Sequence, residues 1–133
     1  MSFVLCADFT IFPDNTQLGP TFPLAGMTFQ DNPGGATSFV NQTSGLNGLQ
    51  FPDVGIEARL PMAVQWVGMY LGQFNSSFIV EVVDSNGVVT SSTTYNKPNT
   101  YSFLNFSQAN IATIRFSGGG NEGVIVSLCI LIP

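Results

Sequence analysis

Residues 78–95 read FIVEVVDSNGVVTSSTTY, two runs rich in β-branched residues on either side of Asp84-Ser85-Asn86-Gly87. An Asn-Gly pair favours the two-residue turns that join antiparallel strands. Alternation in the first run places Phe78 and Val80 on one face of a strand and Glu81 on the other. The stretch therefore predicts a β-hairpin with one buried face.

The same kind of pattern extends over the whole chain, and no window shows the three- and four-residue apolar spacing of a helix. Short β-branched or aromatic runs alternate with Gly, Pro, Asn and Asp, as in β-sandwiches and barrels. The expected strands are 3–10, 27–30, 38–41, 48–51, 55–60, 64–71, 78–83, 88–95, 101–106, 112–116 and 124–132. A chain of 133 residues has the size of one domain. We therefore predict a single all-β domain over residues 1–133, built as a two-sheet antiparallel β-sandwich.

The second half of the chain, 55–130, resembles the galactose-binding-like jelly-roll β-sandwich modules. The residues that carry the resemblance are 55–61, 67–72, 80–87 and 114–125. Their shared order is strand, Asp-x-x-Gly turn, strand, glycine-rich turn and an apolar last strand. The resemblance implies jelly-roll topology with the first and last strands side by side. It implies no particular ligand, because modules of one fold carry many functions.

Composition excludes several classes of partner. Charged residues make up only 8% of the chain, against about 25% in ordinary domains. The net charge is −5, and the basic residues are Arg59, Lys97 and Arg115 alone. Binding to nucleic acid requires a basic surface that displaces counterions from phosphate. We therefore expect no nucleic-acid partner, and an anionic membrane surface is disfavoured for the same reason.

The sequence also bears on membranes and cellular address. No apolar run approaches the roughly 18 residues of a transmembrane helix, so we expect no transmembrane segment. The N-terminus lacks the basic region of a Sec signal peptide. A cytoplasmic protein and the mature form of an exported one both fit.

Most catalytic constellations are missing, because the chain contains no histidine. This excludes Ser-His-Asp and Cys-His arrangements and most catalytic zinc, copper and iron sites. Four of the eight carboxylates flank turn residues, where an Asp side chain bonds its own backbone. They are Asp14, Asp31, Asp53 and Asp84. We therefore predict that the protein is not an enzyme.

No cofactor is expected, apart from calcium, which needs only oxygen ligands. Modules of the resembling type often carry a structural calcium near the rim where the first and last strands meet. Asp8 and Glu122 are the candidate ligands here. The two cysteines, Cys6 and Cys129, are interpreted as buried free thiols, with a disulfide between the terminal strands as the alternative.

Residues 64–72 carry the most informative pattern for binding. Alternation places Val67, Met69 and Leu71 inward, and Trp66 and Tyr70 outward with a glycine between them. Exposed aromatic planes beside polar groups suit sugar rings, which have an apolar C–H face and a rim of hydroxyls.

The same parity argument predicts that the side chains of Glu81 and Arg115 point outward. If these strands share a sheet, both residues lie on the face of Trp66 and Tyr70. Gln73 and Asn75 are further hydrogen-bonding candidates. The predicted ligand-binding set is thus Trp66, Tyr70, Gln73, Asn75, Glu81 and Arg115.

Two functions follow from this pattern. The first is a non-catalytic, lectin-like module that binds a glycan. The second is a structural protein that self-assembles or docks to a partner chain and has no small-molecule ligand. The N-terminal segment, 16–22 or another subunit would then cover the aromatic stripe. The last strand, 124–132, is apolar on both faces, so it needs cover on both sides. Together with the low surface charge, this favours a homo-oligomer.

Overall fold

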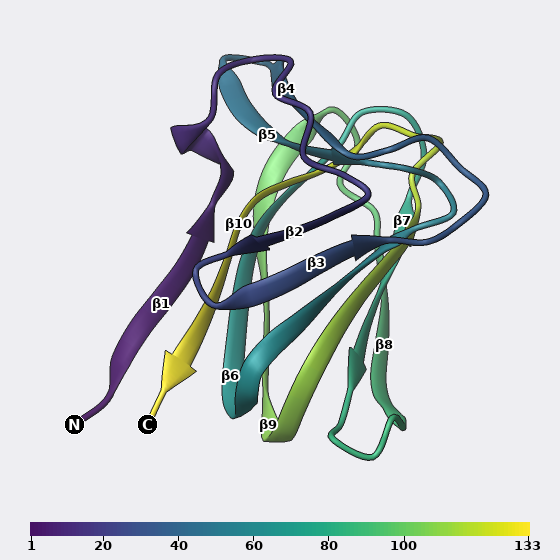
Figure 1. Cartoon of the computed structure of the whole chain (residues 1–133). Coiled ribbons are helices and arrows are strands. Elements are labelled where there is room, and N and C mark those ends of the chain that lie inside the picture. Colours follow the sequence, from purple (N-terminus) through teal and green to yellow (C-terminus); the bar gives the residue numbers. More distant parts are fainter.

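The computed structural model describes all residues, 1–133, as ten β-strands and one short 3-10 helix (Figure 1). The elements in chain order are β1 (Phe3–Asp8), η1 (Phe9–Ile11), β2 (Thr21–Leu24), β3 (Met27–Asp31), β4 (Phe39–Thr43), β5 (Leu46–Phe51), β6 (Ile56–Gln73), β7 (Phe78–Val83), β8 (Val89–Tyr95), β9 (Thr100–Gly118) and β10 (Gly123–Ile132). No helix in this chain has the length and apolar character needed to cross a bilayer.

The strands form two layers, and every strand pair is antiparallel. We call the layers sheet I and sheet II. Sheet I contains β4, β5, β10, the second half of β6 and the first half of β9, with β1 paired to β10. Sheet II contains β2, β3, the first half of β6, the second half of β9, β7 and β8. The predicted antiparallel β-sandwich is confirmed.

Two long strands connect the layers. β6 has 18 residues and β9 has 19, and both fold over at the lower end of the molecule in Figure 1. Their pairing is interrupted between Arg59 and Val64, and Asn110 adopts a positive φ of 62°. Pro61 lies within this interruption, where its missing N–H breaks no ladder hydrogen bond. All ten strands nevertheless belong to one hydrogen-bonded sheet, although their side chains pack as two layers.

The hydrophobic core lies between the layers and contains 23 buried side chains. Sheet I contributes Val67 and Leu71, and sheet II contributes Val80 and Ile114, all four fully buried. The side-chain parity of β6 changes at the bend. The even-numbered residues Ile56 and Ala58 point inward before it, and the odd-numbered residues point inward after it. This change of parity decides where the outward side chains lie.

Several expected strands differ from the observed ones. The runs 55–60 and 64–71 belong to one strand, β6, and the runs 101–106 and 112–116 belong to β9. β2 was not expected. It contains Pro23, which argues against a central strand, but β2 has only β3 as a partner, and an edge strand tolerates proline. The hairpin of β7 and β8 is confirmed, with the Gly87 amide donating to the Asp84 carbonyl at 3.0 Å.

The first and last strands pair over six positions, as the resemblance implied. Cys6 lies directly opposite Cys129, and the two form a disulfide with a Cα–Cα distance of 4.0 Å. The interpretation as buried free thiols is wrong. Ala7 points into the core, so Cys6 points outward, where it is exposed.

The expectation that β10 is buried on both faces is correct for its first half only. Residues 123–126 are buried between β5 and β6. Beyond a bulge at Val126, every second residue reaches the surface, and Leu131 is exposed. The fold itself therefore covers the first half of β10.

Candidate functional site

The outer face of sheet I presents aromatic side chains from the second half of β6. Val67, Met69 and Leu71 are buried in the core, so Trp66 and Tyr70 point to the other side and are half-buried at the surface. The parity predicted for this strand is therefore observed.

Two glycines on this face make room for flat-lying rings. A Cβ at Gly68 would come within 2.5 Å of Cη2 and 2.6 Å of Cζ2 of the Trp66 indole. A Cβ at Gly72 would come within 2.6 Å of Cε1 of Tyr101. Both rings therefore lie over glycine backbone, where any larger residue would lift them away from the sheet.

Five rings on this face make up what we call the aromatic strip: Trp66, Tyr70, Phe74, Tyr101 and Phe103. The last four are in contact ring to ring, and Trp66 lies four positions before Tyr70 on β6. The Tyr70 ring lies 4.6 Å from Phe103 and 5.8 Å from Tyr101, centroid to centroid, and Tyr101 lies 5.1 Å from Phe74. Phe103 is 78% exposed, which is unusual for so large an apolar side chain. The strip follows β6 and the adjoining β9, where Tyr70 is paired with Phe103 and Gly72 with Tyr101.

Hydrogen bonding fixes one end of the strip. The Tyr101 hydroxyl donates to the carbonyl of Thr43 at 2.7 Å. Burial raises the pKa of Tyr101 above its usual value of 10, and the hydrogen bond to Thr43 opposes this only in part. The phenol is therefore neutral at physiological pH and its ring is held in place.

Uncharged polar groups flank the rings. Ser107 is the cross-strand partner of Trp66, Asn105 is that of Gly68, and Ser127 is that of Tyr70. Asn105 and Ser107 are exposed, and their side chains make no hydrogen bond within the chain. These groups are free to bond the hydroxyls of a ligand that lies on the strip.

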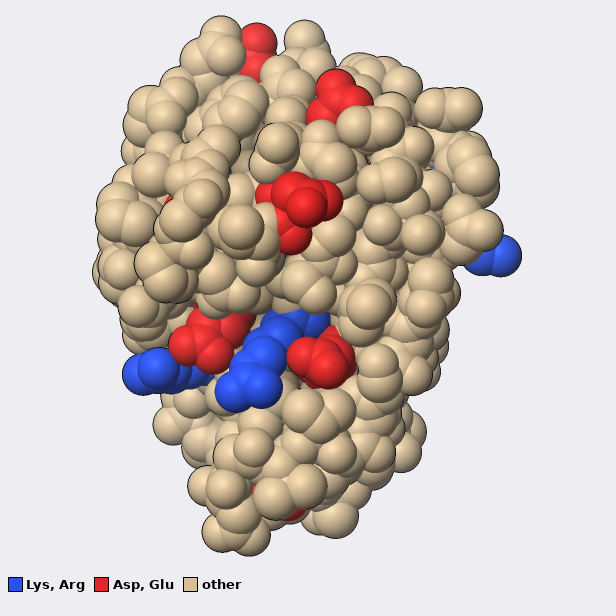
Figure 2. Space-filling model, turned by 90° about the vertical axis from the view of Figure 1, so that its right-hand side faces the viewer, with Lys and Arg blue, Asp and Glu red and all other residues tan.

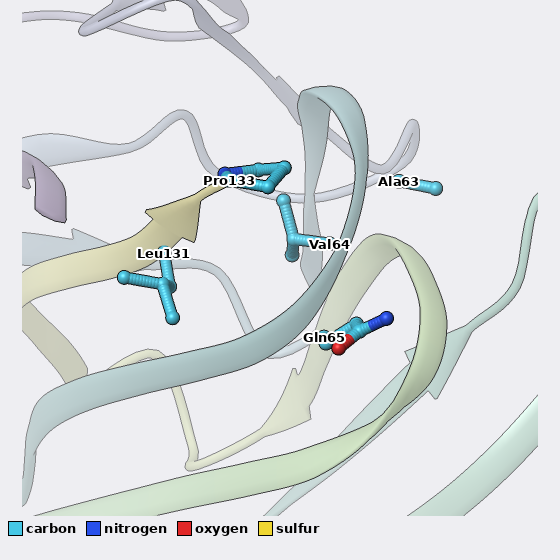
Figure 3. A pocket seen from close by; sticks show the side chains of 5 residues that line it. All are labelled: Ala63, Val64, Gln65, Leu131 and Pro133. Atoms are coloured by element: carbon cyan, nitrogen blue, oxygen red, sulfur yellow. The ribbon is translucent and has the colours of Figure 1, made fainter. Parts of the chain in front are cut away.

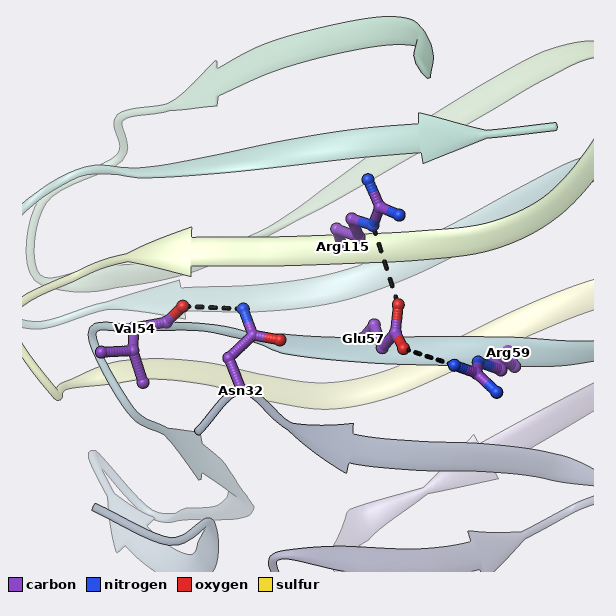
Figure 4. Close-up of polar contacts among 5 residues, drawn as sticks. All are labelled: Asn32, Val54, Glu57, Arg59 and Arg115. Carbon is purple, nitrogen blue, oxygen red and sulfur yellow. Dashed lines mark hydrogen bonds and ion pairs between the residues drawn. The ribbon is translucent and has the colours of Figure 1, made fainter. Parts of the chain in front are cut away.

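Glu81 and Arg115 do not belong to this face, which corrects the sequence-based expectation. They are paired with each other on sheet II, where Arg115 is also the partner of Glu57. Glu57 accepts from Arg59 at 3.1 Å and lies 3.7 Å from Arg115 (Figure 4). Figure 2 shows basic and acidic groups gathered on one side of the molecule, within largely uncharged surface. The expectation failed because β9 changes layers at its bend, which carries Arg115 to sheet II, where β7 with Glu81 is its partner.

Gln73 and Asn75 also differ from expectation. Gln73 is buried, and its amide is used at both ends: the oxygen accepts from the Lys97 amide at 2.6 Å and the nitrogen donates to Asn96 at 3.2 Å. It holds the turn after β8 and is not free for a ligand. Asn75 is exposed and donates to the Gly120 carbonyl at 3.2 Å.

The two residues proposed as calcium ligands are not brought together. Asp8 is paired with Ser127, and Glu122 precedes β10 by one residue. Five positions along a strand correspond to roughly 16 Å. Asp8 instead accepts from the amide and the hydroxyl of Thr10, at 3.0 and 2.7 Å, at the start of η1. No group of three or more carboxylate or thiol side chains that could hold a metal exists in the chain, so these residues do not fit the ion.

The other aspartates are occupied by backbone amides. Asp14 accepts from Gln42, and Asp53 accepts from Gly120. Asp84 accepts from Asn86 and Val88, at 2.9 and 3.0 Å. Asp31 is buried and accepts from the amide and hydroxyl of Ser38. The expected bonding of local turn backbone is observed for Asp84. Asp14, Asp31 and Asp53 instead bond amides of other segments of the chain, and Asp31 is the last residue of β3.

The molecule has one small hollow, at the bend of β6 (Figure 3). Its volume is about 160 Å³, and its lining residues are Ala63, Val64, Gln65, Leu131 and Pro133. Pockets for small molecules usually measure about 300–1,000 Å³. The hollow is therefore smaller than a usual small-molecule pocket, whereas the aromatic strip lies on open surface.

Sequence reasoning missed three members of the strip, Phe74, Tyr101 and Phe103. Alternation in 101–106 places Tyr101 and Phe103 on one side, but Leu104 and Phe106 on the other side are equally apolar. Pattern alone could not tell which side faces the core. The structure packs Leu104 and Phe106 against the core and turns the other two outward.

Comparison with known proteins supports the fold. No protein-family model matches the sequence, and no curated protein matches it either. Among solved structures, a family 29 carbohydrate-binding module from Piromyces equi is similar, with a TM-score of 0.55 and 10% identity over 99% of this chain and 91% of that one. A second structure described as a family 29 module has a TM-score of 0.56 and 11% identity, over 98% and 89%. A variant of a family 29 module in complex with cellulohexaose has a TM-score of 0.55 and 10% identity, over 98% and 91%.

At this level of identity the likeness concerns the fold. The chain has the galactose-binding-like jelly-roll β-sandwich fold of these modules, as its resemblance in 55–130 implied.

Proposed function

We propose that this protein is a non-catalytic carbohydrate-binding module whose ligand lies along the aromatic strip on the outer face of sheet I. One observation carries the proposal: five aromatic side chains lie on one open face of sheet I, four of them in contact ring to ring, and two of the five rings lie over glycine backbone. A core would bury such rings, and a catalytic centre would place titratable groups among them.

Binding would combine stacking with hydrogen bonding. The C–H face of a sugar ring stacks on an aromatic plane, and its hydroxyls bond to Asn105, Ser107 and Ser127. Rings that are already fixed lose little conformational entropy when a ligand binds. Trp66 and Tyr101 are held by their contacts with the sheet, so the strip is prepared for an extended sugar chain.

The absence of catalysis is part of the proposal. The chain has no histidine, and the carboxylates of its five aspartates accept hydrogen bonds from backbone amides. The similar solved structures are described as carbohydrate-binding modules, which is consistent with a protein that binds sugars and leaves them unchanged.

A glycan screen read by Trp66 fluorescence tests this function, since Trp66 is the only tryptophan. We expect at least one glycan to shift or quench the emission. The Phe103→Ala variant should lose binding, and the control Ile79→Ala, an exposed apolar side chain on sheet II, should retain it. A screen with no ligand above background would remove the proposal.

A second candidate function is self-assembly, with the homo-oligomer expected from the sequence. The observation that favours it is the edge of β1 that faces away from β10. This edge has no partner strand, and β1 begins with the exposed side chains Phe3 and Val4. Unprotected apolar edges are sites of strand pairing between chains. Light scattering at micromolar concentration should then give a stable oligomer, and a monomeric mass would count against it.

A further inference from the structure

We propose that Asp8 makes the aromatic strip selective for uncharged glycans and against glycans that carry carboxylate or sulfate groups. The inference rests on the proposed function and concerns the same face of the molecule.

Asp8 lies in one cross-strand row with the centre of the strip. Its partner across the sheet is Ser127, the next is Tyr70 and the last is Phe103. Neighbouring strands are about 4.8 Å apart, so Asp8 and Tyr70 are separated by roughly 10 Å. Only the small Ser127 stands between them. A sugar chain that follows the strip would pass beside Ser127, and substituents on that side of the chain would point toward the carboxylate.

The charge of Asp8 is not neutralised. One of its oxygens accepts from the amide and the hydroxyl of Thr10, and both are neutral donors. The ion pairs of the protein are both made by Glu57, on sheet II. Lys97 lies in the turn between β8 and β9. Among all residues in the strands of sheet I, Asp8 is the only one that carries a charge.

This arrangement treats neutral and anionic sugars differently. The remaining oxygen of Asp8 can accept hydrogen bonds from sugar hydroxyls. A uronate or sulfate on that side of the chain meets a like charge with no Lys or Arg in the strands of sheet I, on a protein whose net charge is already −5. At physiological salt, charges more than about 8 Å apart are largely screened, so the repulsion acts on substituents that lie over Ser127 and not on groups centred over Tyr70.

The experiment compares polysaccharides that differ in charge on a shared backbone. Trp66 fluorescence is titrated with hydroxyethylcellulose against carboxymethylcellulose, and with methyl-esterified polygalacturonate against polygalacturonate. The protein variants are Asp8→Asn, which keeps an oxygen for Thr10, and Glu81→Gln. Glu81 lies on β7 in sheet II and makes no ion pair. The second variant therefore changes the net charge equally on the layer that does not carry the strip.

We expect the wild-type protein to bind the neutral member of a pair about two- to fivefold more tightly, the range that interactions between exposed charges give. Asp8→Asn should reduce this preference, Glu81→Gln should keep it, and added salt should narrow it. Equal affinity for both members, or equal effects of the two variants, overturns the role of Asp8 while leaving the glycan-binding function in place. Failure of every neutral and anionic polymer to bind overturns both.

Discussion

The indole of Trp66 lies over the α-carbon of Gly68, two residues further along the same strand. A methyl group at that carbon would be 2.5 Å from the indole, closer than non-bonded carbon atoms approach. Both residues belong to sheet I, and the indole is one end of the aromatic strip. The conformation of the binding surface therefore depends on a residue that has no side chain.

Gly68→Ala should weaken glycan binding while the protein stays folded. The added methyl forces the indole off the sheet, at a cost of about 1–3 kcal/mol if the ring cannot move freely. Trp66 emission should shift, because the ring becomes more exposed. Gly35→Ala is the matched control: it introduces a contact of 2.5 Å with Val54, an exposed side chain far from the strip. Unchanged emission and affinity in Gly68→Ala would contradict the prediction.

Phe103→Ala should separate binding from stability. The ring is 78% exposed, and surface substitutions usually change stability by less than about 0.5 kcal/mol. An aromatic anchor in a binding site is worth about 2 kcal/mol or more when truncated, so affinity should fall at least tenfold. Urea unfolding and ligand titration on the same variant check both parts. A large loss of stability with intact binding would mean that the ring is structural.

Stability should decline above pH 10 through two tyrosines. Burial raises the pKa of Tyr95 and of Tyr101 above 10, and the hydrogen bonds with Ser102 and Thr43 oppose this only partly. As the pH rises, the two phenols therefore lose their protons in the unfolded chain before they do so in the folded protein. Their contribution to the free energy of unfolding is complete below pH 10 and is lost as the pH rises through their folded-state pKa values. Urea unfolding between pH 8 and 11.5 should show the decline. Tyr101→Phe should make it shallower, and an unchanged slope would argue against the burial of that phenol.

Reduction of the disulfide should lower the free energy of unfolding substantially. Cys6 and Cys129 are 123 positions apart, and in the chain-entropy model closing a loop of about 100 residues is worth about 4.7 kcal/mol. Urea unfolding with and without a reductant measures the difference. The double variant Cys6→Ser with Cys129→Ser should match the reduced protein and should not respond to reductant. A stability equal to that of the oxidised protein would show that β1 holds to β10 without the covalent bond.

The sequence predicted the architecture because the β-sandwich depends on local signals. The Asn86-Gly87 turn and the alternation in 64–71 each specify a strand direction and a buried face without reference to distant residues. The outward position of Trp66 and Tyr70 followed from the same alternation, and the structure agrees.

The remaining site residues depend on long-range geometry. Glu81 and Arg115 were placed beside Trp66 on the assumption that their strands share a sheet with 64–71. The bend of β9 carries Arg115 to the other layer, and β7, which contains Glu81, pairs only with strands of that layer. Gln73 is of a residue type that often binds ligands. Only its hydrogen bonds with Asn96 and Lys97 show that its side-chain amide is used within the fold. No local pattern contains this information.

The bends in β6 and β9 have a consequence for the evolution of the molecule. Each of these two strands supplies one segment to the aromatic surface and another, with its own parity, to the charged surface around Glu57. Substitutions at 66, 101 and 103 can therefore alter what the first surface recognises without disturbing the second. One chain segment thus carries two surfaces that selection can reshape independently.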